Sequence, residues 1–245
     1  MKRIMLKVAY DGTNYHGWQV QPNGETIEGV LNRCLSELLQ EKIEVIGASR
    51  TDSGVHAREN IAVFDTDSLI PPKKVAYALN ARLPEDIRIQ ESEEVDADFH
   101  PRHCDSRKTY EYKIYNATFS MPIERLYSYF TYVPLDVHKM QEAARYLVGI
   151  HDFKSFCSVG SQAENTVRHV EKVEVCKADN IITITVSGRG FLYNMVRIMA
   201  GTLMEVGKGR LMPEDIARIL EAKDRNAAGP TAPACGLTLV KYEFL

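Results

Sequence analysis

A short polar loop, residues 47–57, carries the residue types best suited to chemistry. It contains two glycines, several hydroxyl side chains, an arginine, an aspartate and a histidine, and apolar runs precede and follow it. Binding and catalytic side chains collect on such loops because the elements on either side position them. Asp52 is therefore a candidate nucleophile or base. Asp-Ser-Gly is also ordinary turn sequence, in which an aspartate bonds its own backbone.

Arg50 lies two positions before Asp52 and has two possible roles. A neighbouring arginine favours the ionised form of a carboxylate, which a nucleophile requires. Its forked donors are also well suited to binding phosphate. One guanidinium does not easily serve both purposes, and the residues alone leave the two roles open.

Basic and aromatic side chains are interleaved around Tyr110, with Arg107 and Lys108 directly before it. A half-buried tyrosine in a sheet is the ordinary interpretation of such a residue. The alternative is an aromatic platform for an RNA base, with Arg107 and Lys108 following the phosphates. The Tyr110 hydroxyl could also transfer a proton.

Arg197 lies in an apolar segment that predicts a helix from Phe191 to about Val206. Helical spacing places Arg197 and Gly201 on a face beside the apolar one. Arginine is seldom buried without a partner, so this position predicts a carboxylate nearby, and Asp52 is the candidate. A surface-exposed arginine is the alternative.

Composition limits the class of protein. The 245 residues include 44% hydrophobic and 26% charged residues, with a net charge of −3, which is ordinary for a soluble globular chain. The scattered cysteines indicate reduced thiols, and His100, His103 and Cys104 form the only His/Cys cluster, without a second ligand pair. No nucleotide-binding motif is present. We expect a cytoplasmic protein without metal, cofactor, signal peptide or membrane span.

The element pattern predicts an α+β fold. We expect two ferredoxin-like β-α-β-β-α halves, residues 1–105 and 106–245, forming a largely antiparallel mixed sheet with helices on one face and a basic cleft between the halves. Strands are expected at residues 4–10, 43–47, 60–66, 109–114, 170–176, 181–187 and 237–244. Helices are expected at residues 27–39, 71–83, 136–149, 191–206 and after Pro213.

The loop at Asp52 and several further blocks resemble the TruA family of tRNA pseudouridine synthases. The blocks occur in family order along the whole chain, although Ser53 and Pro101 stand where alanine is expected. The similar segments are residues 10–12, 17–19, 49–57, 79–84, 107–112, 149–153, 190–197 and 231–237.

The resemblance implies isomerisation of uridine to pseudouridine at positions 38 to 40, in the anticodon stem and loop of tRNA, by a homodimer that acts on RNA rather than DNA. Asp52 corresponds to the nucleophile, which attacks either the base or the ribose. Tyr110 corresponds to the residue that contacts the uridine and is a candidate base, and Arg197 to the arginine paired with the aspartate. Arg50 would hold the nucleotide out of the stack, and Leu237 would help to wall the pocket.

Two other functions remain to be weighed. A chain with this scaffold could bind RNA without catalysis, although the presence of Asp52 favours the enzyme. A glycoside hydrolase would need a second carboxylic acid near Asp52, for which Glu59 and Asp152 are the candidates.

Overall fold

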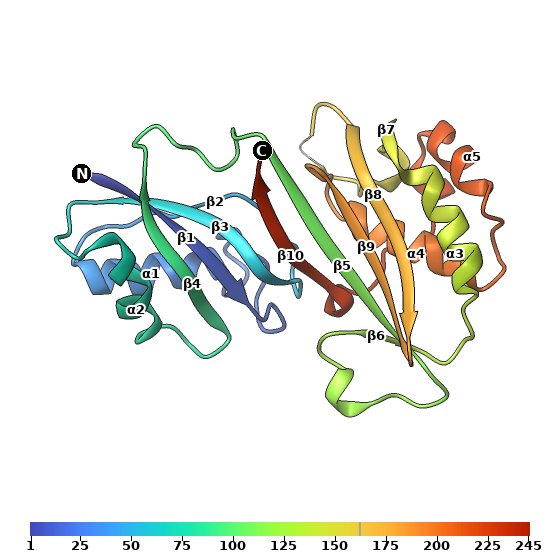
Figure 1. The fold of residues 1–245 in the computed structure, drawn as a ribbon, viewed down its shortest axis with the longest axis horizontal. Coiled ribbons are helices and arrows are strands. Elements are labelled where there is room, and N and C mark those ends of the chain that lie inside the picture. Colours follow the sequence, from blue (N-terminus) through green and yellow to red (C-terminus); the bar gives the residue numbers. More distant parts are fainter. Residues whose placement is uncertain (162) are drawn as a thin grey trace. The chain divides into compact units, whose positions relative to one another are not determined.

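The computed structural model describes residues 1–161 and 163–245. Contacts within the chain divide it into two compact units, which Figure 1 shows in ribbon form. The first unit contains Met1–Asp105 and Leu239–Leu245, and the second contains Ser106–Thr238. Residues 239–245, which were expected in the second half, have their contacts with the first unit. Each unit combines helices with a mostly antiparallel sheet, which confirms the α+β class.

The sheet of the first unit is built around β1 (Lys2–Tyr10). This strand pairs antiparallel with β3 (His56–Thr66) and with β4 (Ile87–Val95), and the short β2 (Ile46–Gly47) pairs antiparallel with β3. The C-terminal strand β10 (Leu237–Phe244) also neighbours β3. Burial alternates along β1, as the period of a half-buried strand requires.

Two helices, α1 (Ile27–Leu39) and α2 (Val75–Asn80), contact each other in the first unit. Thr26 caps α1, because its hydroxyl accepts a hydrogen bond from the Gly29 amide at 3.2 Å. The α1 bounds confirm the prediction, whereas α2 is shorter than expected. Asn80 ends α2 and bonds both the amide and the carbonyl of Ile89 at 2.8 Å, which fastens the helix to β4.

The strand predicted at residues 43–47 is wrong for most of its length. The amide of Ile43 donates to Ser36 Oγ at 3.0 Å, and that of Val45 donates to Asn32 Oδ1 at 2.8 Å. Because both acceptors are α1 side chains, these amides are not available to a strand ladder. The strand predicted at residues 60–66 begins earlier, at His56.

The second unit contains a sheet in the order β5–β9–β8–β7. Neighbouring strands on this path are antiparallel, whereas β6 pairs with β5 in parallel. The bounds are β5 Ser106–Asn116, β6 Tyr129–Thr131, β7 Gly149–Asp152, β8 Val167–Ala178 and β9 Ile181–Arg189. The β8–β9 hairpin turns at Asp179-Asn180, as predicted.

The helices of the second unit are α3 (Val137–Ala144), α4 (Met195–Gly207) and α5 (Asp215–Ala222). Asp136 caps α3 by accepting from the Lys139 amide at 3.1 Å. The prediction that α4 starts at Phe191 is wrong, because Asn194 has φ 58° and cannot continue a right-handed helix. Within the described part of the chain, no helix is long and apolar enough to cross a membrane.

Candidate active site

The polar loop connects β2 to β3, and its first residues are fixed by Asn60. This fully buried side chain accepts from the Ser49 amide at 3.2 Å and donates to the Ser49 carbonyl at 3.0 Å. The Ala48 amide donates to the Ile61 carbonyl at 2.7 Å, which extends the pairing of the neighbouring strands. Hydrogen bonds to both the amide and the carbonyl of Ser49 therefore fix the backbone that leads to Asp52.

Thr51, the residue before Asp52, is held by its side chain and by its backbone. Its hydroxyl lies 2.7 Å from the hydroxyl of Tyr10, and its carbonyl accepts from the Trp18 amide at 3.0 Å. All three residues are buried. Burial raises the pKa of the Tyr10 phenol well above its usual value, so that this hydroxyl stays neutral.

Asp52 opens a tight turn. Its carbonyl accepts from the Val55 amide at 3.1 Å, and the Gly54 amide and Ser53 hydroxyl both donate to the Tyr15 carbonyl at 3.2 Å. The backbone of Asp-Ser-Gly therefore forms a turn, in agreement with the ordinary interpretation of this sequence. The Asp52 side chain is partly exposed and belongs to a loop that the core of its unit holds in place.

Two glycines allow residues 12–17 to pack directly against this loop. A Cβ on Gly17 would lie 2.7 Å from the Thr51 carbonyl oxygen, and one on Gly12 would lie 2.0 Å from the Val55 carbonyl oxygen. The Gly12 amide also donates to His56 Nδ1 at 3.0 Å. In the sequence, Gly12 and Gly17 stand out only as members of segments that resemble the family. The close backbone contact that they permit is seen only in the folded chain.

Tyr110 lies on β5 opposite Val186 of β9 and is buried. Its ring meets the ring of Phe191 edge to face, with centroids 5.3 Å apart. This placement agrees with the ordinary interpretation of a tyrosine within a sheet. It also fixes the ring plane, which an aromatic platform requires.

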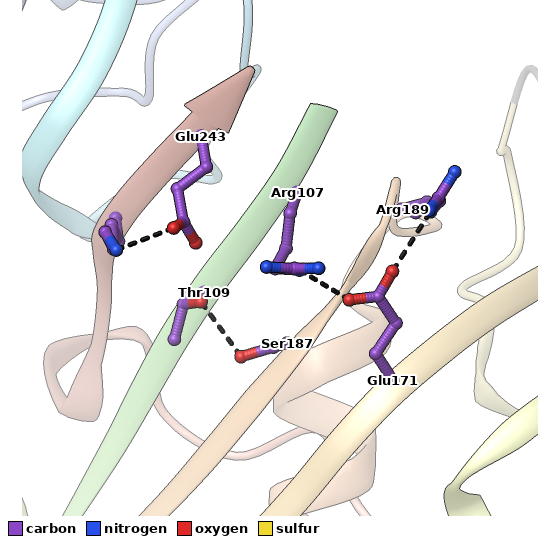
Figure 2. A network of polar contacts seen from close by, with 7 residues as sticks. Arg107, Thr109, Glu171, Ser187, Arg189 and Glu243 are labelled. Carbon is purple, nitrogen blue, oxygen red and sulfur yellow. Dashed lines mark hydrogen bonds and ion pairs between the residues drawn. The ribbon is translucent and has the colours of Figure 1, made fainter. Parts of the chain in front are cut away.

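Arg107 takes part in an ion-pair network at the same end of the second unit's sheet (Figure 2). Glu171 Oε2 lies 2.5 Å from Arg107 Nε, and its other oxygen lies 3.0 Å from Arg189 Nε. The hydrogen bonds from Arg189 and Arg107 lower the pKa of Glu171. Lys108, the other predicted phosphate contact, lies on β5 opposite Gly188.

The position of Glu171 results from an irregularity in the sheet. Val170 pairs with Gly188, while Lys172 pairs with the adjacent Ser187, so Glu171 is an extra residue in β8. Such a bulge redirects the side chain it carries. Here it gives one carboxylate to an arginine on each of two neighbouring strands.

Arg197 lies in the first turn of α4 and is half-buried, which does not match the alternative of a surface-exposed arginine. Its Nε donates to the Ala232 carbonyl at 2.8 Å, and its Nη1 donates to Asn194 Oδ1 at 2.7 Å. A Cβ on Gly201 would lie 1.8 Å from the Pro230 carbonyl oxygen. Arg197 and Gly201 thus share a helix face, as their spacing predicted, and residues 230–232 cover that face.

Leu237 begins β10 and is buried. The segment before it contacts β5, because the Tyr112 hydroxyl donates to the Pro233 carbonyl at 2.9 Å. A Cβ on Gly236 would lie 2.7 Å from the Tyr112 ring. Leu237, Tyr110 and Arg197 all belong to the second unit, and Asp52 and Arg50 belong to the first.

The carboxylates considered for a glycoside hydrolase are both ion-paired. Glu59 lies 3.5 Å from Lys7, and Asp152 accepts from Thr166 at 2.5 Å and lies 3.1 Å from Lys223. The Thr166 hydroxyl and then Lys223 lower the pKa of Asp152. A general acid needs a raised pKa, so this environment disfavours that role.

The residues considered for a metal site do not form one in the described ranges. Within residues 1–161 and 163–245, no group of three or more His, Cys, Asp or Glu side chains could hold a metal ion. His100 and His103 stack with centroids 4.0 Å apart, and Cys104 Sγ donates to the His100 carbonyl at 3.3 Å.

The sequence matches known proteins from end to end. A family model described as tRNA pseudouridine synthase matches residues 7–103 and 143–244. The tRNA pseudouridine synthase A of Acetivibrio thermocellus is 48% identical over 244 residues, and that of Ruminiclostridium cellulolyticum is 50% identical over 245 residues. Each match covers 100% of both chains. The resemblance seen in the sequence is thus confirmed: the chain belongs to the tRNA pseudouridine synthase family, whose members are isomerases.

Proposed function

We propose that this enzyme converts uridine to pseudouridine at positions 38, 39 and 40 of tRNA, with Asp52 as the nucleophile. The observation that carries the proposal is the aspartate on a loop fixed by Asn60, Tyr10 and Trp18, in a chain similar over its full length to tRNA pseudouridine synthases A. A nucleophile must be held in position before the substrate arrives, and this loop meets that requirement.

The reaction moves one glycosidic bond without any net change in composition. The Asp52 carboxylate adds to the uridine, either at the base or at the ribose, and the bond between N1 and C1′ breaks. The base turns within the pocket, C5 bonds to C1′, and the carboxylate is released. The proton on C5 leaves and N1 gains a proton. The uridine must first leave the helical stack, since its reactive atoms are buried there.

Each remaining site residue has a proposed role in this reaction. Tyr110 contacts the uridine and takes up the C5 proton as its hydroxyl gives up its own, so that it relays a proton. Arg197 orients Asp52 and keeps it ionised. Arg50 holds the nucleotide out of the stack, and Leu237 walls the pocket. Arg107 and Lys108 contact phosphates; the Arg107 network in Figure 2 supports this by holding its guanidinium in one orientation.

We further propose that the enzyme is a cytoplasmic homodimer that needs no cofactor. We also propose that its two halves are ferredoxin-like and that the first, residues 1–105, carries the loop of Asp52 (residues 47–57, the aspartate loop). The pairing of β1 with β3 and β4, and of β2 with β3, supports the ferredoxin-like order in the first half. Sedimentation of the purified protein tests the dimer.

The nucleophile is tested with Asp52→Ala, measured by pseudouridine sequencing of tRNA and by tRNA binding. We expect this variant to fold and bind tRNA but to form no pseudouridine. Asp67→Ala is the matched control, because the Asp67 side chain is exposed and pairs with the chain's amino terminus at 2.7 Å. Pseudouridine made by Asp52→Ala would contradict the assignment. Product at other tRNA positions would contradict the proposed specificity alone.

Arg197 is tested with Arg197→Ala. Turnover should fall more than tRNA affinity, because the proposed role is to orient and ionise Asp52. An equal loss of turnover and affinity would instead indicate a phosphate contact.

A further inference from the structure

Arg102 belongs to a turn that is firmly attached to the first unit. The Pro101 carbonyl accepts from the Tyr242 hydroxyl at 2.8 Å, and the His103 amide donates to the His100 carbonyl at 3.0 Å. The Arg102 amide donates to His100 Nδ1 at 3.2 Å. The backbone that carries Arg102 is thus fixed before and after this residue.

The guanidinium of Arg102 is attached to the start of the aspartate loop. Its Nε donates to the Gly47 carbonyl at 2.7 Å. Gly47 cannot shift freely, because its Cα faces Trp18 so closely that a Cβ would lie 2.2 Å from Trp18 Nε1. One edge of the guanidinium is therefore anchored to a rigid point, while Arg102 as a residue remains exposed.

Arg50 lies three positions after Gly47 and is also exposed. It makes no hydrogen bond or ion pair with any residue that the structure describes. Burial and then the charge of Arg50 lower the pKa of Arg102, while the charge of Glu28 acts in the opposite direction. The Oε2 atom of Glu28 already accepts from the Val20 amide at 2.9 Å.

Two like charges near each other destabilise the free protein, and the structure places no carboxylate in a hydrogen bond with either guanidinium. An anion bound by both would remove this repulsion. A phosphodiester fits best, because guanidinium forks match its oxygens and the proposed substrate has one per nucleotide.

We propose that Arg50 and Arg102 together bind a single backbone phosphate of the RNA substrate, beside the nucleotide on which Asp52 acts. The inference rests on the proposed function and adds Arg102 to its binding residues. It also gives Arg50 a partner: the phosphate is held between the exposed Arg50 and Arg102, which is anchored to Gly47. A purely structural Arg102 would account for the bond to Gly47 but not for the nearby Arg50 charge.

The test is the salt dependence of tRNA binding by the full-length protein with Arg50→Gln, Arg102→Gln and both substitutions. Each single variant should weaken binding about tenfold at low salt, as expected for loss of a charged hydrogen bond. The double variant should be little weaker than either single one, because one phosphate is lost in every case. The slope of log K against log salt should become shallower by about 0.7 to 0.9 for the double variant, the value for one phosphate.

Arg33→Gln is the matched control, because Arg33 is an exposed arginine of the same unit that pairs with Glu25 at 2.8 Å. Its slope should equal that of the unmodified protein. If Arg102→Gln fails to fold, Arg50→Gln still gives the change in slope, because it alters only an exposed side chain. Arg102→Lys then replaces Arg102→Gln, since it keeps the charge while removing the guanidinium fork.

Unchanged slopes in the Arg50 and Arg102 variants would overturn the proposal. Fold losses that multiply, with a slope change near twice that for one phosphate, would show two separate contacts and also overturn it. Failure of the proposed function has a different signature: the unmodified protein would form no pseudouridine in tRNA, whatever the slopes.

Discussion

The hydroxyl oxygens of Tyr10 and Thr51 lie 2.7 Å apart, which joins the end of β1 to the residue before Asp52. The Tyr10 hydroxyl also accepts from Asn60 Nδ2 at 3.2 Å, and the same Asn60 side chain bonds Ser49. A hydrogen-bond chain thus runs from the core of the first unit to both sides of Arg50. The position of the aspartate loop therefore depends on buried side chains outside the loop.

Tyr10→Phe should slow pseudouridine formation without abolishing tRNA binding. The change leaves the buried Thr51 hydroxyl without its partner, which costs about 1 to 3 kcal/mol of unfolding free energy. Denaturant unfolding and single-turnover rates measure the two effects. Tyr15→Phe is the matched control, because its hydroxyl bonds Asp86 at 2.6 Å rather than a loop side chain. Equal loss of turnover in both variants would contradict the role of Tyr10.

Gly47→Ala should destabilise the first unit through a steric clash. A Cβ would lie 2.2 Å from Trp18 Nε1, and overpacking of this kind costs about 1 to 3 kcal/mol. Gly209→Ala is the comparison variant, because it introduces backbone strain without a clash. Gly209 has φ +72°, and nothing lies within 4 Å of the added Cβ. Thermal unfolding of both variants is the measurement. A Gly47 variant as stable as the unmodified protein would show that Trp18 can move aside.

Local sequence signals predicted the elements that local interactions build. The α1 bounds follow from the Thr26 cap and the helical apolar spacing, and the β8–β9 turn follows from Asp179-Asn180. The strand at residues 43–47 failed because Ser36 and Asn32 capture its amides from a helix earlier in the chain. Nothing in the strand's own residues reveals that competition.

The candidate site divides in the same way. Residue types indicated Asp52, Arg50 and Tyr110, because their chemistry is visible in the sequence. The supports of the loop were not predicted, since Gly17 against Thr51 and Asn60 against Ser49 are contacts made only after folding. The bond between Arg102 and Gly47 joins positions 55 residues apart, and no local sequence signal predicts such a contact.

Glu171→Gln should reduce stability in a pH-dependent way. The hydrogen bonds from Arg189 and Arg107 hold the pKa of Glu171 below its ordinary value of about 4.5. A carboxyl group with a lowered folded-state pKa adds stability above its unfolded value, and this stability is lost as the pH falls through the folded value. The difference in unfolding free energy between the two proteins should therefore be largest at neutral pH and should shrink below about pH 4.5.

Glu174→Gln is the control for this experiment. Glu174 lies on the same strand, but its side chain is 47% exposed and pairs with Lys172 at 2.7 Å. Exposed pairs contribute little, so this variant should differ from the unmodified protein by less than about 1 kcal/mol at every pH. A difference for Glu171→Gln that stays constant from neutral pH to pH 3 would contradict the ion-pair explanation.

Tyr110→Phe and Tyr112→Phe form a matched pair on one strand, because the two residues are buried and two positions apart on β5. Phenylalanine at position 110 keeps the ring that packs on Phe191 but removes the hydroxyl proposed to accept the C5 proton. We expect this variant to fold and bind tRNA while its turnover falls by about 100-fold or more, as for loss of a general base. Tyr112→Phe loses the bond to Pro233, so it should lose about 1 kcal/mol of stability but keep its turnover. Single-turnover rates with saturating enzyme make the comparison, and full turnover by Tyr110→Phe would show that another group takes the proton.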